Sequence, residues 1–310
     1  MSPSTLTRAA GAALVSCLLL ATAPASAVVA GGSLFSGLYV MGDSLSDNGN
    51  VFAASGGTFP PAPYYQGRFS NGPVAVEVLA AGLGLGAGTF FDFAVGGATT
   101  GADGSAGAGT GMLSQLAGYQ AVLGGGAASS TALYTVWGGA NDLRANPSSA
   151  TITTAINNLT TIVSTLHTMG ARNFLLPNLP DLGLTPEARE AGISGNATFA
   201  SEVFNSQLSL AYGALAAQWT DEHFYYFNAM AAQRGITTGS PANGFTNVTT
   251  ACIGTAGCAT ALYFDAIHPT AAAHQILGNQ VLAAVPEPQA MLMMAAGLLV
   301  LLGVAHRRRV

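Results

Sequence analysis

The chain carries little charge. Asp, Glu, Lys and Arg make up 7% of its 310 residues, and lysine is absent. Between residues 28 and 285 five arginines stand against thirteen acidic residues, a net charge of 5 − 13 = −8 with neutral histidines. Because nucleic-acid binding requires a basic surface, this composition argues against a nucleic-acid partner.

Two common nucleotide and hydrolase motifs are also missing. The chain has no G-x-S-x-G sequence, which excludes the nucleophile elbow of an α/β-hydrolase. Its glycine tracts, "GLGLGAG" and "GADGSAGAGTG", miss the G-x-G-x-x-G spacing of a dinucleotide site and are typical of flexible loops. We therefore expect no cofactor.

Cysteine is scarce as well, with Cys17, Cys252 and Cys258 as the full set. Cys17 falls in a predicted signal peptide, so an even pair enclosing "CIGTAGC" remains. In an exported protein this pair predicts a Cys252–Cys258 disulfide, with two buried thiols as the alternative. Two cysteines with no histidine nearby except His268 argue against a metal site, and none is predicted.

Both ends of the chain have the composition of processing segments. Residues 1–27 contain Arg8, the apolar run "AAGAALVSCLLLATA" and the small-residue sequence "APASA". This pattern predicts a signal peptide cleaved after Ala27, with signal peptidase as a partner. A buried N-terminal helix is the alternative, but the run has no polar face.

The last 25 residues, 286–310, run from Pro286-Glu287-Pro288 through an apolar helix to Arg307, Arg308 and Arg309. The apolar stretch spans about 24 Å, slightly short of a bilayer core, and the arginines predict a cytoplasmic end. The tail resembles the PEP-CTERM sorting signal, which implies recognition and cleavage by an exosortase. A permanent anchor is the alternative. Either way, residues 28–285 are expected outside the inner membrane, in the cell envelope or medium. With exosortase cleavage, this transmembrane helix would anchor them only transiently.

Residues 28–285 alternate between short apolar runs and helix-like stretches. The runs are bounded by Gly, Asn or Pro and suit buried strands, at 38–41, 90–95, 132–137, 172–177 and 223–228. The expected helices lie at 73–83, 112–123, 151–169, 200–219 and 270–284. This alternation predicts one α/β domain, a three-layer α/β/α sandwich around a parallel sheet, with ligand sites at the carboxyl ends of the strands.

A polar cluster follows the carboxyl end of each of the first four predicted strands. Ser44 lies in the first cluster and is either a catalytic nucleophile or a serine that only stabilises a turn. "GDSLSDNGN", "GGATTG", "GGANDL" and "PNLPDLG" follow the first four strands in turn. A serine nucleophile needs an imidazole and a carboxylate that orients it. Asp265 precedes His268 by three residues in a turn, whereas the rival His223 has only sequence-adjacent acids, Asp221 and Glu222.

Four blocks of the chain resemble those of the GDSL, or SGNH, hydrolases, in the same order: "GDSLSDNGN", "FAVGGAT", "GGAND" and "DAIHPT". The segments "GRFSNGPV" (67–74) and "NFLLPNLPDLGLTP" (173–186) resemble the lipase, phospholipase and haemolysin-like branch. The resemblance implies a flavodoxin-like fold, with Ser44 as nucleophile, His268 as general base and Asp265 orienting it. It implies an oxyanion hole of Ser44, Gly97 and Asn141, with Gly96 as the alternative to Gly97.

The resulting hypothesis is an exported esterase or lipase that hydrolyses small-molecule or lipid acyl esters through an acyl-enzyme. A carbohydrate O-acetyl esterase acting on extracellular polysaccharide is one alternative. A non-catalytic surface or matrix protein on the same scaffold is another. The segment 52–67, rich in aromatic residues and proline, is expected to overhang the site. Asp43 and Asp47 are expected to shape the turn and cap the helix that follows Ser44.

Overall fold

The computed structural model describes residues 33–285 of the chain. The predicted signal peptide, 1–27, and the predicted sorting signal, 286–310, lie outside the described residues. Among residues 33–285, no helix is both long enough and apolar enough to span a bilayer.

Five parallel strands form the central sheet, in the order β2-β1-β3-β4-β5. They are β1 (Leu38–Gly42), β2 (Phe90–Asp92), β3 (Leu133–Trp137), β4 (Asn173–Pro177) and β5 (His223–Phe227). All five agree in position with the predicted strands, although β2 ends three residues before residue 95. Backbone bonds to β1 nevertheless continue past Asp92, since the N–H groups of Phe93 and Val95 donate to the C=O groups of Val40 and Gly42 at 2.8 and 3.2 Å.

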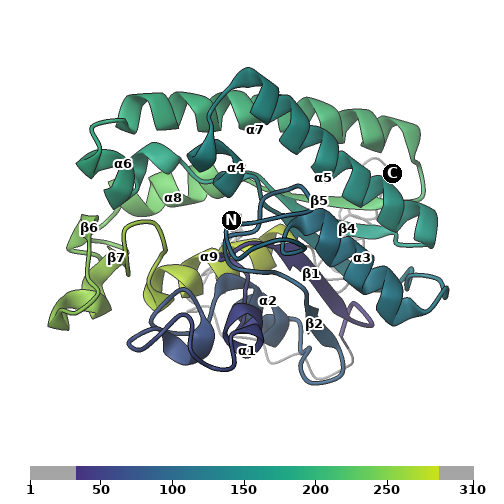
Figure 1. Cartoon of the computed structure of the whole chain (residues 1–310), viewed down its shortest axis with the longest axis horizontal. Coiled ribbons are helices and arrows are strands. Elements are labelled where there is room, and N and C mark those ends of the chain that lie inside the picture. The colour runs from purple at the N-terminus through teal and green to yellow at the C-terminus, as the bar shows by residue number, and fades with distance from the viewer. Residues whose placement is uncertain (1–32, 286–310) are drawn as a thin grey trace, which may run out of the picture. The chain divides into compact units, whose positions relative to one another are not determined.

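Helices cover both faces of the sheet, as the predicted α/β/α sandwich requires (Figure 1). One face packs against α3 (Met112–Leu123), α5 (Ser149–Met169) and α7 (Ser194–Gln218). The other packs against α2 (Ala75–Gly82), α8 (Ala229–Thr238) and α9 (Ala271–Ala284). The predicted fold class is confirmed.

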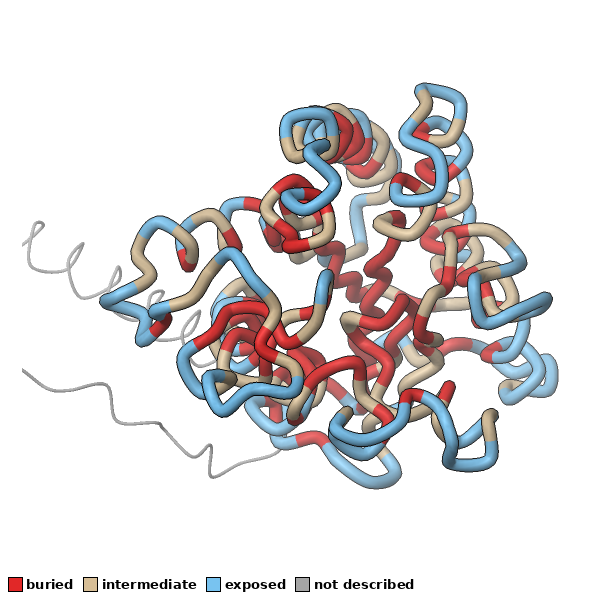
Figure 2. Tube along the Cα trace, turned by 60° about the vertical axis from the view of Figure 1, so that its left-hand side comes forward, coloured by how far each residue is buried: buried red, intermediate tan, exposed pale blue. Residues whose placement is uncertain are grey.

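Each strand alternates its side chains between these two cores. In β1, Leu38 and Val40 enter the core with α2 and α9, whereas Met41 enters the core with α3 and α5. Figure 2 shows the buried residues concentrated on the strands and on the helix faces that meet them. Burial on both faces explains why the inner strands β1, β3 and β4 are continuous apolar runs and not alternating patterns.

Local capping sets the ends of the long helices. The Ser148 side chain accepts the N–H of Thr151, so α5 begins two residues before the predicted start. Gly170, with φ 117°, ends the helix in a left-handed conformation. The helix expected after Ser44 is α1 (Asn50–Ala54), whereas the sequence analysis did not predict α8 or two short helices: α4 (Ala140–Ala145) and α6 (Pro186–Glu190).

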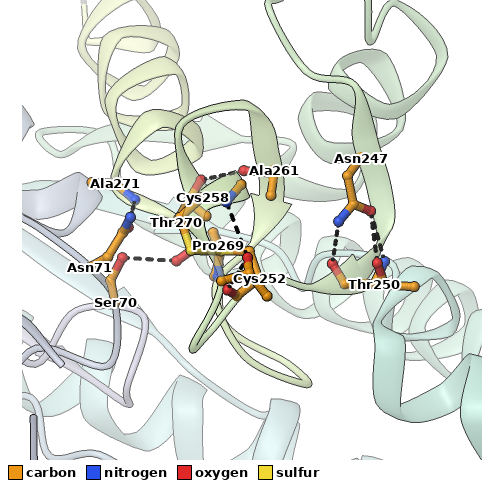
Figure 3. The surroundings of a disulfide bond; sticks show 12 residues. Ser70, Asn71, Asn247, Thr250, Cys252, Cys258, Ala261, Pro269, Thr270 and Ala271 are labelled. Atoms are coloured by element: carbon orange, nitrogen blue, oxygen red, sulfur yellow. Dashed lines mark hydrogen bonds between the residues drawn. A yellow bond between two sulfur atoms is a disulfide. The ribbon is translucent and has the colours of Figure 1, made fainter. Parts of the chain in front are cut away.

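A small second sheet carries the predicted disulfide. Strands β6 (Asn247–Ala251) and β7 (Ala261–Tyr263) pair in parallel, and the Cys252–Cys258 bond closes the loop between them (Figure 3). The N–H of Cys252 donates to the C=O of Phe264 at 3.1 Å. The disulfide loop is thus attached directly to the chain that leads into Asp265.

The strand order places β1 next to β3 at the point where the sheet reverses its direction of winding. In flavodoxin-like sheets, the crevice at the carboxyl ends of these two strands is the usual ligand site. Ser44 follows β1 and Asn141 follows β3. The topology therefore brings two of the predicted site residues to the same edge.

Candidate active site

Ser44 lies in a sharp turn that begins where β1 ends. The C=O of Asp43 accepts the N–H groups of Ser46 and Asp47 at 3.0 and 2.9 Å, and its carboxylate accepts the N–H of Leu45 at 3.0 Å. The N–H of Ser44 itself has no acceptor among residues 33–285. The turn therefore leaves both the hydroxyl and the N–H of Ser44 free to act at the edge of the sheet.

Gly42 fixes where this turn starts. Its N–H donates to Oε1 of Gln115 at 2.9 Å, and its C=O accepts from Nε2 of the same side chain at 2.8 Å. A Cβ on Gly42 would lie 2.8 Å from the carbonyl oxygen of Trp137, closer than side chains approach backbone. Sequence reasoning missed Gln115 because its partner is a backbone 73 residues away.

The side chains of Ser44, His268 and Asp265 form one chain of close polar contacts. Nε2 of His268 lies 2.7 Å from Oγ of Ser44, and Nδ1 lies 2.6 Å from Oδ2 of Asp265. With a proton on Nδ1 donated to the carboxylate, Nε2 can accept the Ser44 proton. Ser44 and His268 are 8% and 7% exposed, so the contacts are shielded from water but remain accessible.

The Asp265 carboxylate is ionised and well anchored. Burial opposes its ionisation, but the hydrogen bond from His268 and the attraction of its imidazole outweigh burial and lower the pKa of Asp265 to about 2. Its Oδ1 also accepts the N–H groups of Ile267 and His268, at 2.9 and 2.7 Å. The three-residue spacing noted in the sequence thus forms a tight turn in which the carboxylate binds both the backbone and the ring.

The loop after His268 is held by the segment 67–74. The Ser70 hydroxyl donates to the C=O of Pro269 at 2.9 Å, and Oδ1 of Asn71 accepts the N–H of Ala271 at 2.7 Å (Figure 3). The second bond satisfies one of the free N–H groups at the start of α9. These contacts give the "GRFSNGPV" segment a structural role in placing the imidazole.

The backbone at Gly96 and Gly97 separates the two candidate oxyanion donors. The N–H of Gly96 donates to Oδ2 of Asp47 at 2.8 Å and is therefore occupied. The N–H of Gly97 has no acceptor within residues 33–285. Gly97 has φ +79°, and a Cβ there would collide with the Ser105 side chain. The hydrogen bonding therefore favours the N–H of Gly97, and not that of Gly96, as the backbone donor of the oxyanion hole.

Asp47 joins the Ser44 turn to this glycine loop. Its Oδ1 accepts the N–H groups of Gly49 and Asn50 at 2.8 and 2.6 Å, which satisfies free donors at the start of α1. Its Oδ2 holds Gly96. Burial raises the pKa of Asp47, although these backbone donors oppose the rise. The expected capping role is observed, together with a cross-link that the sequence did not reveal.

Asn141 supplies a third free donor at the carboxyl end of β3. One hydrogen of its amide goes to the C=O of Ala98 at 2.9 Å, which leaves the other unassigned. Its Oδ1 accepts from Arg144 at 3.3 Å, so the orientation of the amide is fixed from both sides. Ser44, Gly97 and Asn141 therefore carry N–H groups that a negatively charged oxygen could accept.

A largely apolar pocket of about 470 Å³ opens beside these groups. Ser44, Asn141 and His268 are among its lining residues. Helices α4, α6, α7, α8 and α9, strands β3 and β7, and the loops between them supply the rest of its wall, with apolar side chains that include Leu143, Ala188, Ile193, Ala197, Ile236 and Leu277. None of the residues 52–67 contributes to the wall, so this segment borders the site from another side than the pocket.

Several polar side chains of the pocket wall are already paired. Arg144 and Glu187 form a bidentate ion pair, with N–O distances of 2.8 and 2.6 Å. Gln233 accepts the N–H of Asp181 at 2.6 Å and donates to the Tyr263 hydroxyl at 2.8 Å. With these groups satisfied, the wall favours an apolar ligand over a polar one.

The other described histidines lie away from Ser44. His223 is the first residue of β5, at the amino end of the sheet, so the rival base lies at the wrong edge. His274 is fully buried, which lowers its pKa to about 3, and its Nδ1 accepts the N–H of Ala75. His167 lies 2.6 Å from Glu222, an acidic neighbour that the sequence order concealed. His306 lies outside the described residues.

One group of residues has ligand atoms close enough to hold a metal ion, within the described range. His167, Asp221 and Glu222 place these atoms within 4.8 Å of one another. Nε of Arg172 lies 3.1 Å from the Asp221 carboxylate and 3.5 Å from that of Glu222. The guanidinium already supplies the positive charge that these carboxylates need, and the group lies at the opposite edge of the sheet from Ser44.

Comparison with known proteins adds sequence relatives to this geometry. Thermolabile hemolysin of Vibrio parahaemolyticus is 27% identical over 270 residues, 78% of this chain and 62% of that protein. Phosphatidylcholine-sterol acyltransferase of Aeromonas hydrophila is 32% identical over 191 residues, 56% of this chain and 53% of that protein. The chain thus spans between half and two thirds of the length of these relatives.

A solved structure of a member of the lipolytic G-D-S-L family from Veillonella parvula aligns with a TM-score of 0.46 at 12% identity, covering 79% of this chain and 96% of that one. The model of the GDSL-like Lipase/Acylhydrolase family matches residues 38–281, from the first strand to the last helix. This match includes every residue of the Ser44 site. The chain therefore belongs to the GDSL-like lipase and acylhydrolase family.

Proposed function

We propose that this chain is an exported serine hydrolase that cleaves acyl esters through an acyl-enzyme intermediate. The observation that carries the proposal is the unbroken contact chain from Ser44 through His268 to Asp265, with distances of 2.7 and 2.6 Å. A nucleophile, a base and an orienting carboxylate within hydrogen-bond reach are the requirements for such a reaction.

In the proposed reaction, Oγ of Ser44 attacks the acyl carbon while Nε2 of His268 takes its proton. The Asp265 carboxylate stabilises the imidazolium that forms. The tetrahedral intermediate then collapses, and the imidazolium gives the proton to the leaving alcohol. In the second half of the reaction, Nε2 of His268 takes a proton from water while the water oxygen attacks the acyl carbon. The second tetrahedral intermediate collapses, the proton passes to Oγ of Ser44, and the carboxylic acid is released.

Three N–H groups would receive the oxyanion of that intermediate. The donors are the backbone N–H groups of Ser44 and Gly97 and the free amide hydrogen of Asn141, none of which has another acceptor among the described residues. Removing one donor of this kind costs roughly 3 to 4 kcal/mol of transition-state stabilisation. Their freedom from other partners supports the assignment.

The pocket supports acyl esters with a chain longer than acetyl. Ser44 is among its lining residues, its wall is mainly apolar, and its volume of about 470 Å³ is larger than an acetyl group would fill. Each buried methylene contributes about 0.8 kcal/mol, so a longer chain would gain affinity from this wall. The names of the two relatives, a hemolysin and a phosphatidylcholine-sterol acyltransferase, are consistent with lipid substrates.

An ester panel tests this proposal on the purified chain. We expect turnover of p-nitrophenyl esters to rise from acetate to octanoate, together with labelling of Ser44 by a fluorophosphonate probe. Faster release of acetate from acetylated xylan than of fatty acid from phospholipid vesicles would favour the carbohydrate esterase. No hydrolysis and no labelling would favour a non-catalytic protein.

Export and sorting remain part of the proposal, on the basis of the sequence. Residues 1–27 would be removed by signal peptidase, and residues 286–310 would anchor the chain until an exosortase cuts the PEP-CTERM tail. The Cys252–Cys258 disulfide is typical of exported proteins and supports this location. Intact mass spectrometry of the envelope and medium fractions would test it, since a form retaining residues 286–310 would indicate a permanent anchor.

A further inference from the structure

Tyr64 contacts the proposed catalytic machinery from a segment that forms no part of the pocket. It lies between α1 and the short helix η1 (Tyr65–Gly67), and its hydroxyl donates to Oδ2 of Asp265 at 2.7 Å. The two residues are 201 positions apart. The same oxygen, Oδ2, accepts from Nδ1 of His268 at 2.6 Å. The Tyr64 hydroxyl and the imidazole therefore share one carboxylate oxygen.

The Tyr64 phenol is a neutral donor near pH 7. Burial raises the pKa of Tyr64, and the hydrogen bond and charge of Asp265 raise it further. A neutral O–H that donates to a carboxylate withdraws part of the negative charge from other partners of the same oxygen. At Asp265, the partner affected is the His268 ring.

The position of Tyr64 does not depend on its hydroxyl. Its ring meets that of Phe264 edge-on at 5.1 Å and that of Phe69 at 6.1 Å. Phe69 in turn lies 5.2 Å from the His268 ring. Tyr64 also packs against the small core around Cys252. Because aromatic packing holds the ring in place, phenylalanine can replace tyrosine here without disturbing the segment.

We propose that Tyr64 is a positioning residue, which fixes the Asp265 carboxylate and moderates the negative charge that His268 experiences. The proposal rests on the proposed function, since it assigns Tyr64 to the same site. Without the hydroxyl, Oδ2 would lose one of its two hydrogen-bond donors, so the carboxylate would be held less firmly and would present its full charge to the imidazole. His268 would then hold its proton at higher pH and be less well aligned with Ser44.

Several other titratable groups face this pair and are not altered by a change at Tyr64. Asp43 precedes Ser44, and the Arg144–Glu187 ion pair approaches from α4 and α6. His274 on α9 is buried and neutral near pH 7, since its pKa is lowered to about 3. A shift observed on removal of the Tyr64 hydroxyl can therefore be attributed to that hydroxyl.

The test compares Tyr64→Phe with Tyr65→Phe in the full chain. Tyr65 is the matched control, because it is 40% exposed and its hydroxyl has no hydrogen-bond partner among the described residues. For Tyr64→Phe we expect kcat to fall about 10-fold at unchanged KM, and the acidic limb of the kcat/KM profile to move up by about half a pH unit. Tyr65→Phe should match the wild type in both.

A readout without catalysis separates this inference from the proposed function. The ring protons of His268 can be followed by NMR against pH, with His268→Ala as the assignment control. We expect the titration midpoint of this ring to rise in Tyr64→Phe and not in Tyr65→Phe. An unchanged midpoint, or a loss of kcat with no movement of either profile, would overturn the proposal. A wild-type chain that titrates as expected but hydrolyses no ester would contradict the proposed function instead.

Discussion

Nε2 of His268 lies 2.7 Å from Oγ of Ser44, although 224 positions separate the two residues in the chain. The turn after β1 presents the hydroxyl, and the loop before α9 presents the imidazole. Neither loop could hold its side chain alone: Gln115 anchors the first through Gly42, and Ser70 and Asn71 anchor the second. The geometry of this pair leads to the first prediction.

Replacing Ser44 or His268 by alanine should lower kcat by at least about 10³-fold, because each change removes a group that acts in the transition state. His223→Ala is the control, since this histidine lies at the amino end of β5, and its activity should equal that of the wild type. The measurement is p-nitrophenyl butyrate hydrolysis by protein of unchanged melting temperature. Loss of activity in His223→Ala with activity retained in His268→Ala would reverse the assignment of the base.

Asn141→Ala should lower kcat by about 10²- to 10³-fold with little change in KM, because its amide donates chiefly to the charge that develops on the substrate oxygen. Asn146→Ala is the matched control, at the end of the same helix α4, where the side chain is exposed. Steady-state kinetics on one ester distinguishes the two. Equal kcat values in the two variants would remove Asn141 from the oxyanion hole.

Gln115→Leu should lower the free energy of unfolding by about 2 kcal/mol, because it leaves the buried N–H of Gly42 without its acceptor and removes a donor to its C=O. Urea denaturation followed by circular dichroism would measure the change. Gln120→Leu, on the exposed face of the same helix α3, controls for the substitution itself. A similar loss in both variants would mean that the bond to Gly42 contributes no more than the helix surface does.

The fold was predictable from the sequence largely because the inner strands β1, β3 and β4 are buried on both faces. Runs such as 133–137 and 173–177 are mainly apolar without a polar residue at every second position, so they are recognised as buried strands. The helices between the strands are long enough to be recognised as helices. The short helices α4 and α6 escaped prediction because six and five residues are too few to show a helical period. Their existence depends on contacts such as Arg144 with Glu187, which no local pattern reveals.

In the proposed site, too, some residues could be predicted from the sequence and others could not. The residues that carry the chemistry stand in recognisable blocks, so Ser44, Asp265 and His268 could be named from the sequence. The choice between Gly96 and Gly97 could not be made there, because it depends on the bond from Gly96 to Asp47 across 49 positions. Tyr64 escaped for the same reason, since its partner lies 201 positions away.

Ala197→Phe should shorten the acyl chain that the enzyme prefers. Ala197 lies on α7 and lines the apolar wall, so a phenyl ring there would occupy volume needed by a long chain. We expect kcat/KM for an octanoate ester to fall about 10-fold or more, and that for acetate to stay within about 2-fold. Ala214→Phe, at an exposed position of α7, is the control. Uniform loss on both esters would place the acyl chain elsewhere.

Asp43→Asn should stabilise the protein at pH 8 more than at pH 4. Burial raises the pKa of Asp43 from 3.8 to about 6, and the bond from the Leu45 N–H opposes this only partly. A raised carboxyl pKa means that the folded state favours the protonated form, so its contribution to stability is full below pH 4 and is lost as the pH rises through 6. The rise of the pKa from 3.8 to about 6 corresponds to about 3 kcal/mol at most. Asparagine keeps the acceptor for Leu45 but has no charge to bury.

Urea denaturation at both pH values, with Asp103→Asn at an exposed position as control, would measure the difference. A gain that is equal at pH 4 and pH 8 would show that the charge of Asp43 is not what limits stability at alkaline pH.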